Sequence, residues 1–432
     1  MSSIWQKGIQ RDTVRSFYRN MQTDVLVIGG GMAGILCAYM LKQAGVDCVL
    51  VEAKRLCDGV TGGTTAKITL QHGLIYDKLI GRYGEEWARL YLQAQREACG
   101  IYEGLCRTID CDYEKQDAYV YSLDDRGAIE REVDAYTRLG GKAAFCETVD
   151  LPFSVAGAVR VKEQAQFHPL KFAYAVAKGI TAYEHTKVQQ LMPRKAVTDR
   201  GEIRYKKAIV ATHFPIDNKH GGYFLKMYQH RSYVVALNGV KPFNGMYVDE
   251  DEKGLSFRSY GDLLLLGGGA HRTGKQGGNW RELEAVARRY YPLSRLVAEW
   301  AAQDCITLDG MPYIGQYSKK TPDLYVATGF NKWGMTSSMV AARVLTDLIL
   351  EKSCEYERVF FPSRKPVWSA LATNAASATV GVLTPTKPRC PHLGCALTYN
   401  TAEHSWDCPC HGSRFTEAGA LIDNPATDDL WK

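Results

Sequence analysis

The sequence predicts an α/β protein in which a large domain with a parallel sheet precedes a small all-β domain. Three observations predict this division. Near the N-terminus, an apolar strand runs into a glycine-rich turn and a helix at residues 25–41. Near the C-terminus, four of the thirteen cysteines fall between Cys390 and Cys410. A stretch rich in proline, alanine, serine and threonine separates the two regions and is typical of a linker.

The composition is that of a soluble globular protein, and 432 residues are enough for two or three domains. The 53 basic and 47 acidic residues leave a net charge of +6, and the basic residues are scattered along the chain. Nucleic-acid binding requires a concentrated basic face. We therefore expect no nucleic-acid partner.

No segment has the pattern of a membrane span or a secretory signal. Residues 25–41 are uncharged, but they are fewer than the roughly 20 residues of a spanning helix and contain three consecutive glycines. The polar, charged first 24 residues are too long for the basic start of a signal peptide. We expect a cytoplasmic protein with no membrane association.

The N-terminal motif is typical of a dinucleotide site. The apolar residues 25–28 form a strand, and Gly29, Gly31 and Gly34 follow in a G-x-G-x-x-G pattern that opens a helix. The three glycines allow a tight turn, close approach of a pyrophosphate and close packing of helix on strand. The helix N-terminus attracts phosphate. Glu52, 23 residues after Gly29, ends the next strand, where an acid binds a ribose hydroxyl. The motif by itself does not distinguish NAD from FAD.

The rest of the large domain alternates between helical and strand patterns. Helical spacing covers residues 75–109, a strand-rich region runs from 118 to 240, and two more helices are predicted at 280–291 and 336–351. A second glycine run, at 267–269, lacks a third glycine and a following apolar helix. We interpret it as a strand and loop of a substrate domain and not as a second nucleotide site.

The C-terminal cysteines alternate with histidines. Cys390-x-His392 and Cys408-x-x-His411 each offer one thiolate and one imidazole. A Rieske two-iron, two-sulfur (2Fe-2S) centre needs two of each, so Cys390 and Cys408 would bind one iron and His392 and His411 the other. The same four side chains could form a structural zinc site. The H-x-G-C and C-P-C-H-G-S contexts favour the cluster.

This region resembles Rieske proteins of the respiratory-complex type. The resemblance implies a disulfide between Cys395 and Cys410, and it implies that Ser413 hydrogen-bonds a cluster sulfur. Phe415 stands where the family often has a tyrosine, which predicts a lower reduction potential. A domain of 54 residues has too small a core to be stable without additional cross-links or contacts. The cluster, the disulfide and contact with the large domain would supply them.

Residues 24–350 resemble the D-amino-acid oxidase-like (DAO) family of FAD-dependent oxidoreductases. The resemblance rests on the glycine motif, on a small-residue segment at 62–67 and on a late strand and helix start at 323–336. The D-G-x-P segment at 309–315 also matches. It implies a Rossmann-like FAD-binding domain with an interleaved α+β substrate domain, in addition to the small all-β Rieske domain.

The resemblance also implies which residues bind FAD. Gly29, Gly31, Gly34 and Glu52 would hold its adenosine diphosphate half, and Val188 would contact the adenine. The pyrophosphate and the flavin ring would lie near Thr64, Thr65, Ala66, Gly329, Gly334, Met335 and Thr336. Lys67 is either a partner of the flavin ring or a solvated strand residue.

No catalytic residue can be assigned from the sequence. The family's arginine for substrate carboxylates lies a few residues before the D-G-x-P segment, where this chain has Asp304, and this puts a simple amino-acid substrate in doubt. Five residues are candidates to line the substrate pocket: His72, His213, Arg231, Tyr233 and Trp333.

These observations predict an FAD-dependent oxidoreductase at residues 22–355, a linker at 356–378 and a Rieske 2Fe-2S domain at 379–432. The enzyme would oxidise a small amine or amino-acid-like substrate at a C–N bond and pass electrons one at a time to an external acceptor. The alternative is a flavin and Rieske electron carrier or redox sensor without its own organic substrate. The direction of electron flow stays open.

Overall fold

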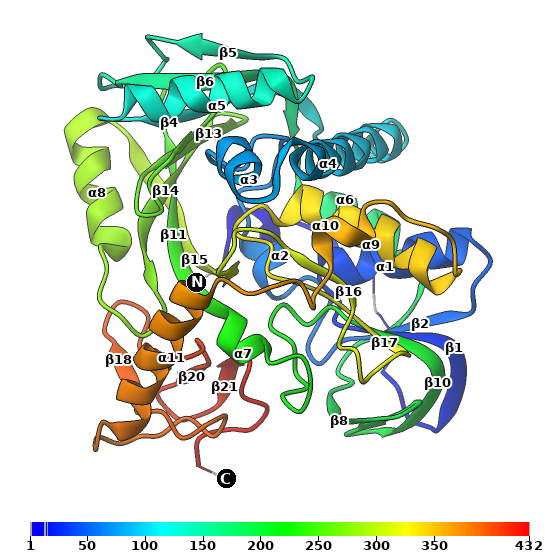
Figure 1. The fold of residues 1–432 in the computed structure, drawn as a ribbon. Helices are drawn as coiled ribbons and strands as arrows, with labels where there is room; N and C mark the ends of the chain where they lie inside the picture. The colour runs from blue at the N-terminus through cyan, green and yellow to red at the C-terminus, as the bar shows by residue number, and fades with distance from the viewer. Residues whose placement is uncertain (1, 13, 15, 432) are drawn as a thin grey trace.

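The computed structural model describes residues 2–12, 14 and 16–431, which form three β-sheets and the helices around them (Figure 1). In the first sheet, β1 (Met21–Ile28) lies between β2 (Cys48–Val51) and β10 (Gly201–Val210) and runs parallel to both. Residues 25–28 are buried because a parallel sheet is covered on both faces. The other strands of this sheet are β7 (Thr181–Tyr183), β8 (Val188–Met192), β9 (Lys195–Thr198), β16 (Tyr313–Gln316) and β17 (Leu324–Thr328).

Helices α1 (Met32–Gln43) and α9 (Gly334–Ile349) pack against each other beside this sheet. Each directly follows a strand and a glycine-containing turn, as the sequence predicted. In the described part of the chain, no helix is both long and apolar enough to cross a membrane. The other helices near this sheet are η1 (Ile4–Gln6), α2 (Val60–Gly63), α3 (Tyr76–Tyr83), α4 (Glu85–Cys106), α6 (Pro169–Ala177) and α10 (Glu357–Phe360).

The second sheet has nine strands, and its long strands β11 (Met227–Asn238), β14 (Leu263–Arg272) and β15 (Arg295–Thr307) pair antiparallel. The second glycine run lies inside β14, and a Cβ at Gly269 would lie 2.4 Å from the Asn279 carbonyl oxygen. These glycines therefore let α8 (Asn279–Tyr290) pack closely on the strand. The remaining elements of this layer are β3 (Lys67–Ile68), β4 (Glu114–Ser122), α5 (Arg126–Arg138), β5 (Ala143–Cys146), β6 (Gly157–Gln166), α7 (Tyr223–Lys226), β12 (Met246–Asp249) and β13 (Ser256–Tyr260).

The third sheet is a small antiparallel one at the C-terminus, which lies beside β11 and β15 (Figure 1). The segment predicted as a linker is partly helical, because α11 (Trp368–Leu383) begins within it and runs past the expected boundary. Alanine strongly favours helix, and this outweighs the linker-like composition. Gly381 brings the helix against the cysteine loops, since a Cβ there would lie 2.5 Å from Cys410 Sγ. The sheet consists of β18 (Thr398–Asn400), β19 (Ser405–Asp407), β20 (Arg414–Thr416) and β21 (Leu421–Asp423).

Candidate functional site

The turn between β1 and α1 has the geometry of a dinucleotide site. Gly29 has a φ of +111°, and a Cβ there would lie 2.5 Å from the Ala211 carbonyl oxygen. A Cβ at Gly34 would lie 1.9 Å from the Gly29 carbonyl oxygen, so α1 can pack here only with glycine. Gly31 is the N-cap of α1 and carries no side chain that would cover the free N–H groups of the helix. Thr61 Oγ1 accepts the Met32 N–H at 2.9 Å, and among the described residues no other side chain covers the start of α1, which is the kind of helix N-terminus that binds phosphate.

Glu52 lies beside this turn. Its Oε2 accepts the Gly30 N–H at 2.7 Å, and its Oε1 accepts the Lys54 N–H at 2.8 Å. Burial raises the pKa of Glu52, although these two hydrogen bonds act in the opposite direction. The backbone thus fixes the carboxylate at the end of β2, at the position of a ribose ligand.

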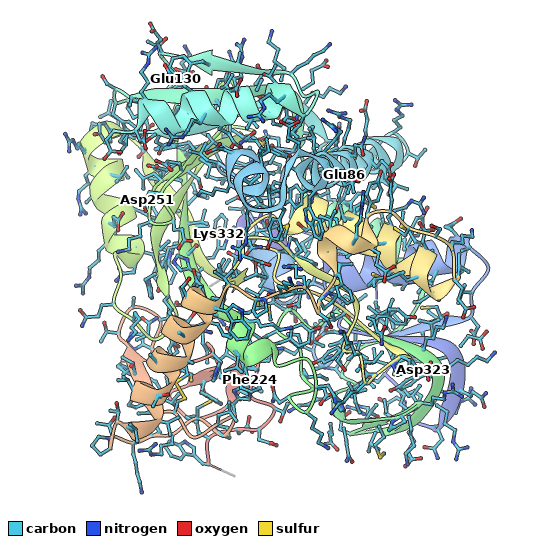
Figure 2. All side chains as sticks on the ribbon, in the orientation of Figure 1. Glu86, Glu130, Phe224, Asp251, Asp323 and Lys332 are labelled. Atoms are coloured by element: carbon cyan, nitrogen blue, oxygen red, sulfur yellow. A yellow bond between two sulfur atoms is a disulfide. The ribbon has the colours of Figure 1, made fainter. Side chains whose placement is uncertain are left out.

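A cavity of about 530 Å³ lies against the second sheet, beside α2 and the start of α9. Four of the predicted flavin neighbours line it: Thr64, Thr65, Gly334 and Met335. Ala66, Gly329 and Thr336 do not line it, although each is adjacent in the chain or in space to residues that do. Figure 2 shows Lys332, which also lines the cavity, near the centre of the molecule.

Lys67 lines the same cavity and is not a solvated strand residue. Its Nζ donates to Thr65 Oγ1 at 3.1 Å. Burial, with a smaller contribution from nearby Arg258, lowers the pKa of Lys67 to about 7. An amine with such a pKa can exchange a proton near neutral pH.

Val188 lies elsewhere. It is buried at the start of β8 and borders a separate depression of about 200 Å³, together with residues 216–219 and Thr427. The structure does not bring it into contact with the large cavity.

Three of the five predicted pocket residues line the large cavity, namely His72, Tyr233 and Trp333. The His72 ring stacks on Trp333 with centroids 5.0 Å apart, and burial lowers the pKa of His72 to about 3, so it is neutral at pH 7. The prediction is wrong for His213 and Arg231, which do not line the cavity. Arg231 lies on the face of β11 that meets the C-terminal domain, where it pairs with Glu403, because successive residues of a strand point to opposite faces. His213 lies in the loop after β10, where its carbonyl oxygen accepts the Thr328 hydroxyl.

The four predicted cluster ligands converge at one end of the C-terminal sheet. Cys390 and Cys408 are buried free thiols whose sulfurs are within hydrogen-bonding reach of each other. The rings of His392 and His411 lie 5.0 Å apart. Three ring nitrogens, both of His392 and Nδ1 of His411, are buried and have no hydrogen-bond partner among the described residues.

Buried nitrogens without partners are costly unless something else binds them. Burial lowers the pKa of His392 to about 4 and that of His411 to about 3, so both rings are neutral, as metal ligands must be. Two thiols and two imidazoles with this environment fit a Rieske cluster.

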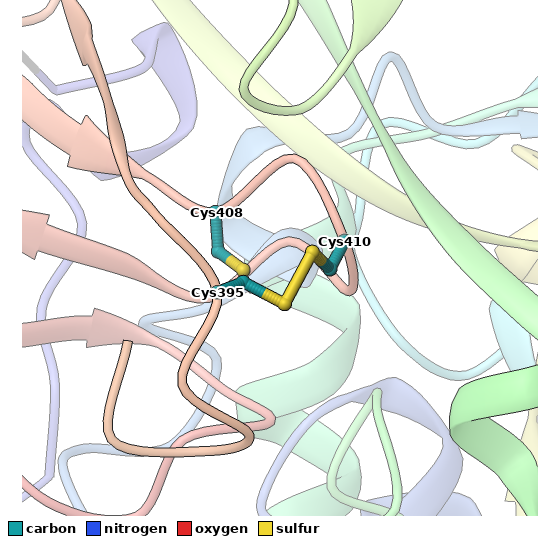
Figure 3. Close-up of side chains that lie close together, drawn as sticks. All are labelled: Cys395, Cys408 and Cys410. Carbon is teal, nitrogen blue, oxygen red and sulfur yellow. A yellow bond between two sulfur atoms is a disulfide. The ribbon is translucent and has the colours of Figure 1, made fainter. Parts of the chain in front are cut away.

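A disulfide joins the two ligand loops. Figure 3 shows the bond between Cys395 and Cys410, with the Cys408 side chain beside it. The sulfurs of these three cysteines lie within 4.8 Å of one another. Because Cys395 and Cys410 are bonded to each other, this group is no metal site of its own.

Strands β11 and β15 separate the cavity from the cysteine loops. Ser232 and Asp304 line the cavity, whereas Gln229 and Gln303 point to the C-terminal domain. Gln229 Nε2 donates to the His411 carbonyl oxygen at 3.0 Å. Gln303 Nε2 donates to the Gly412 carbonyl oxygen at 2.9 Å. The loop that carries His411 is therefore fixed to the back of the cavity wall.

Buried charges hold the two domains together. Glu403, in the C-terminal domain, forms ion pairs with Arg231 of β11 and with Arg414. The exposed fractions of the Arg231 and Glu403 side chains are only 5% and 10%. Breaking such a buried pair is strongly destabilising. The two domains are therefore held in one fixed arrangement by buried contacts.

The sequence predicted contact between the two domains but not the residues that make it, nor the acidic wall of the cavity. The residues concerned are Gln229, Gln303, Glu403, Lys332 and the acidic run 249–252. The acidic run is visible in the sequence, but a short charged run after a strand is typical of a solvated loop. The glutamines give no sequence signal.

Comparison with known proteins identifies both regions. Residues 24–348 match the FAD dependent oxidoreductase (DAO) family, and residues 375–432 match the Rieske [2Fe-2S] domain. A protein of Bacillus subtilis (strain 168), YhfW, named as a Rieske 2Fe-2S iron-sulfur protein, is 33% identical over 99% of this chain and 96% of its own length. Gamma-glutamylputrescine oxidoreductase of Escherichia coli (strain K12) is 26% identical over 76% of this chain and 83% of its length.

Solved structures show the same fold. Glycine oxidase from Geobacillus kaustophilus superposes with a TM-score of 0.67 at 18% identity, over 80% of this chain and 99% of that one. L-amino acid deaminase from Proteus vulgaris gives a TM-score of 0.65 at 16% identity, over 83% and 100%. The predicted fold class is confirmed. The chain belongs to the FAD dependent oxidoreductase family, and it is an enzyme that binds FAD and carries a C-terminal Rieske domain with a 2Fe-2S cluster.

Proposed function

We propose that the enzyme oxidises a small amine or amino-acid-like substrate at a C–N bond and passes the electrons singly, through the Rieske cluster, to an external acceptor. One observation carries this proposal. The same two strands, β11 and β15, line the cavity with one face and hold the cluster loop with the other. A flavin in the cavity and a cluster at His411 would be separated by a single sheet.

In this proposal Cys390 and Cys408 bind one iron, and His392 and His411 bind the other. Gly29, Gly31 and Gly34 would hold the phosphates of FAD, and Thr64, Thr65, Gly334 and Met335 would hold its ring in the cavity. The relatives support the choice of substrate, since one is named for oxidation of an amine, gamma-glutamylputrescine.

The chemistry balances with one external partner. The substrate carbon loses a hydride and its nitrogen loses a proton, so that a C=N bond forms. FAD supplies the two-electron acceptor for this step, and the cluster supplies one-electron transfer. Two electrons then leave in two single steps to a one-electron acceptor outside the chain. Lys67, with its pKa of about 7, is placed in the cavity to accept the nitrogen proton.

Anaerobic mixing of the purified holoenzyme with a panel of amines and amino acids tests the proposal. We expect one class to bleach the flavin absorbance and the Rieske EPR signal to follow. Bleaching by no member of the panel, with both centres still reducible by dithionite, would overturn it. That result would favour the electron carrier or redox sensor.

A further inference from the structure

The lining of the cavity is rich in acidic side chains. Five carboxylates belong to it, those of Asp304 and of the acidic run 249–252, against the three lysines Lys67, Lys78 and Lys332. Among the described residues, no arginine lines the cavity. A site with this balance of charge attracts cations more than carboxylates.

Asp304 and Glu252 are the two carboxylates of this group whose side chains have no hydrogen-bond or ion-pair partner among the described residues, and of the two only Asp304 is partly buried. It follows Gln303, which faces the other domain, and its side chain points to the opposite side of β15, into the cavity. No hydrogen bond or ion pair joins its side chain to another described residue. Burial raises the pKa of Asp304, and the more distant His213, Lys332 and Arg231 offset this only in part.

The cations of the cavity have other partners. Lys332 Nζ donates to the Glu252 carbonyl oxygen at 3.0 Å, and Lys67 Nζ donates to Thr65 Oγ1 at 3.1 Å. Lys78 is exposed. An enclosed carboxylate without a partner is costly, so a cationic ligand at Asp304 would gain a strong charge-assisted interaction.

Two residues of the acidic run belong to the solvent-exposed part of the cavity lining. Asp251 and Glu252 are both exposed and both line the cavity. Burial raises the pKa of Asp249, in the same run, to about 6. A carboxylate can ionise fully when a cation lies beside it.

The nitrogen that is oxidised must be neutral, because a protonated amine has no lone pair to form the C=N bond. A carboxylate beside that nitrogen would keep it protonated. The carboxylates of the cavity therefore suit a second cationic group of the substrate, away from the reacting bond.

We propose that the substrate is a diamine or polyamine and that Asp304 is its specificity-determining residue, which binds the ammonium group that does not react. This inference rests on the proposed amine oxidation and narrows its substrate class. It predicts discrimination against a substrate of the same length whose distant group is apolar or negatively charged.

Three probes of matched length test it: 1,4-diaminobutane, pentylamine and 5-aminopentanoate. They share one amine, and the distant group is an ammonium, a methyl or a carboxylate. Binding to the oxidised holoenzyme is measured from the perturbation of the flavin spectrum, which needs no turnover. We expect the diamine to bind about tenfold or more tightly than pentylamine, and 5-aminopentanoate to bind most weakly.

Asp304→Asn keeps the size of the side chain and removes its charge. We expect it to weaken diamine binding about tenfold, to leave pentylamine binding unchanged and to strengthen binding of 5-aminopentanoate. Asp262→Asn, an exposed carboxylate outside the cavity, is the matched control and leaves all three affinities unchanged. Flavin absorbance and the Rieske EPR signal verify that each variant is folded.

Equal affinity for the three probes, or a preference for the diamine that persists in Asp304→Asn, would overturn the inference. If Asp304→Asn does not fold, the ranking of the probes by the unsubstituted enzyme decides alone. Reduction of the flavin by amino acids without a preference for diamines would refute this inference and leave the proposed amine oxidation standing. Reduction by no amine would refute the proposed function itself.

Discussion

Gln303 and Asp304 are consecutive residues of β15 whose side chains point to opposite sides of one sheet. Gln303 Nε2 donates to the Gly412 carbonyl oxygen at 2.9 Å, whereas Asp304 lines the cavity. Because successive side chains of a β-strand point to opposite faces, two neighbouring residues of β15 reach the cavity on one side of the sheet and the cluster domain on the other. Gln303 and Gln229 hold each other by a hydrogen bond of 2.7 Å, which stiffens the connection.

We predict that Gln303→Leu will slow the transfer of electrons from flavin to cluster. The substitution leaves the Gly412 carbonyl and the Thr273 hydroxyl without their partner, and each buried unpaired group costs about 1–3 kcal/mol. Anaerobic stopped-flow absorbance compares flavin reduction with cluster reduction. Gln189→Leu, an exposed position in β8, is the control. A lower stability with an unchanged transfer rate would show that Gln303 only stabilises the fold.

Glu403 makes the domain interface sensitive to acid. Burial acts to raise the pKa of Glu403, but Arg231 and Arg414 outweigh it and hold the pKa at about 2, below the ordinary value of 4.5. Ionised Glu403 therefore stabilises the folded state fully above pH 4.5, and this contribution is lost as the pH falls towards 2. The shift corresponds to about 3 kcal/mol.

We predict that Glu403→Gln will lower the free energy of unfolding by about 3 kcal/mol at pH 7 and by less at pH 3. Denaturant unfolding at the two pH values measures the difference. Glu417→Gln, an exposed site in the same domain, serves as the comparison. An equal loss at both pH values would contradict the assignment of this acid sensitivity to Glu403.

His392→Ala is expected to remove the Rieske EPR signal and leave the flavin spectrum intact, because it takes one imidazole from the proposed iron ligands. His404→Ala is the matched control, since His404 lies in the same domain with 72% of its side chain exposed. Iron analysis and EPR of the reduced protein measure the result. Retention of a normal Rieske signal in His392→Ala would refute the ligand set, and stoichiometric zinc would support the alternative metal site.

We predict that two residues beside the cysteines shift the reduction potential of the cluster in opposite directions. The Ser413 hydroxyl hydrogen-bonds the Cys390 sulfur, and Phe415 is fully buried in the core of the C-terminal domain. Loss of a hydrogen bond of about 1 kcal/mol lowers a one-electron potential by roughly 40 mV, so Ser413→Ala should show this decrease. Phe415→Tyr should raise the potential. Potentiometric titration followed by EPR gives both values, and no rise in Phe415→Tyr would count against the role of the missing hydroxyl.

Gly34→Ala is predicted to abolish FAD binding or folding, because its Cβ would lie 1.9 Å from the Gly29 carbonyl oxygen. Gly100→Ala, within α4, meets no atom within 4 Å and should stabilise the helix by about 0.5–1 kcal/mol. The ratio of flavin to protein absorbance and thermal unfolding distinguish the two variants. Normal flavin content in Gly34→Ala would show that α1 can move away from the turn.

Much of the fold and of the candidate site could be predicted from short sequence motifs. The glycine turn and the Cys-His pairs depend on residue types at fixed short spacings. The left-handed φ is adopted within one turn, and each of the two cysteine loops supplies half of the ligand set. For this reason the first sheet, the FAD and Rieske assignments and most of the cavity positions near 64–67 and 334–335 were accessible from the sequence. The helix at α11 was not, because its composition is typical of both linker and helix.

The sequence by itself determined the two cofactors and the order of the two regions. Only the tertiary structure decided which face of β11 and β15 meets the cavity and which meets the cluster domain, since the strands pair over 57 to 80 positions and the second domain docks through residues more than 100 positions apart. Arg231 and Glu403, separated by 172 residues, form a buried ion pair that no local pattern contains. The role proposed for Asp304 likewise depends on the cavity around it. A carboxylate in a strand gives no signal in the sequence, and only its partial burial in the cavity makes a cationic ligand favourable.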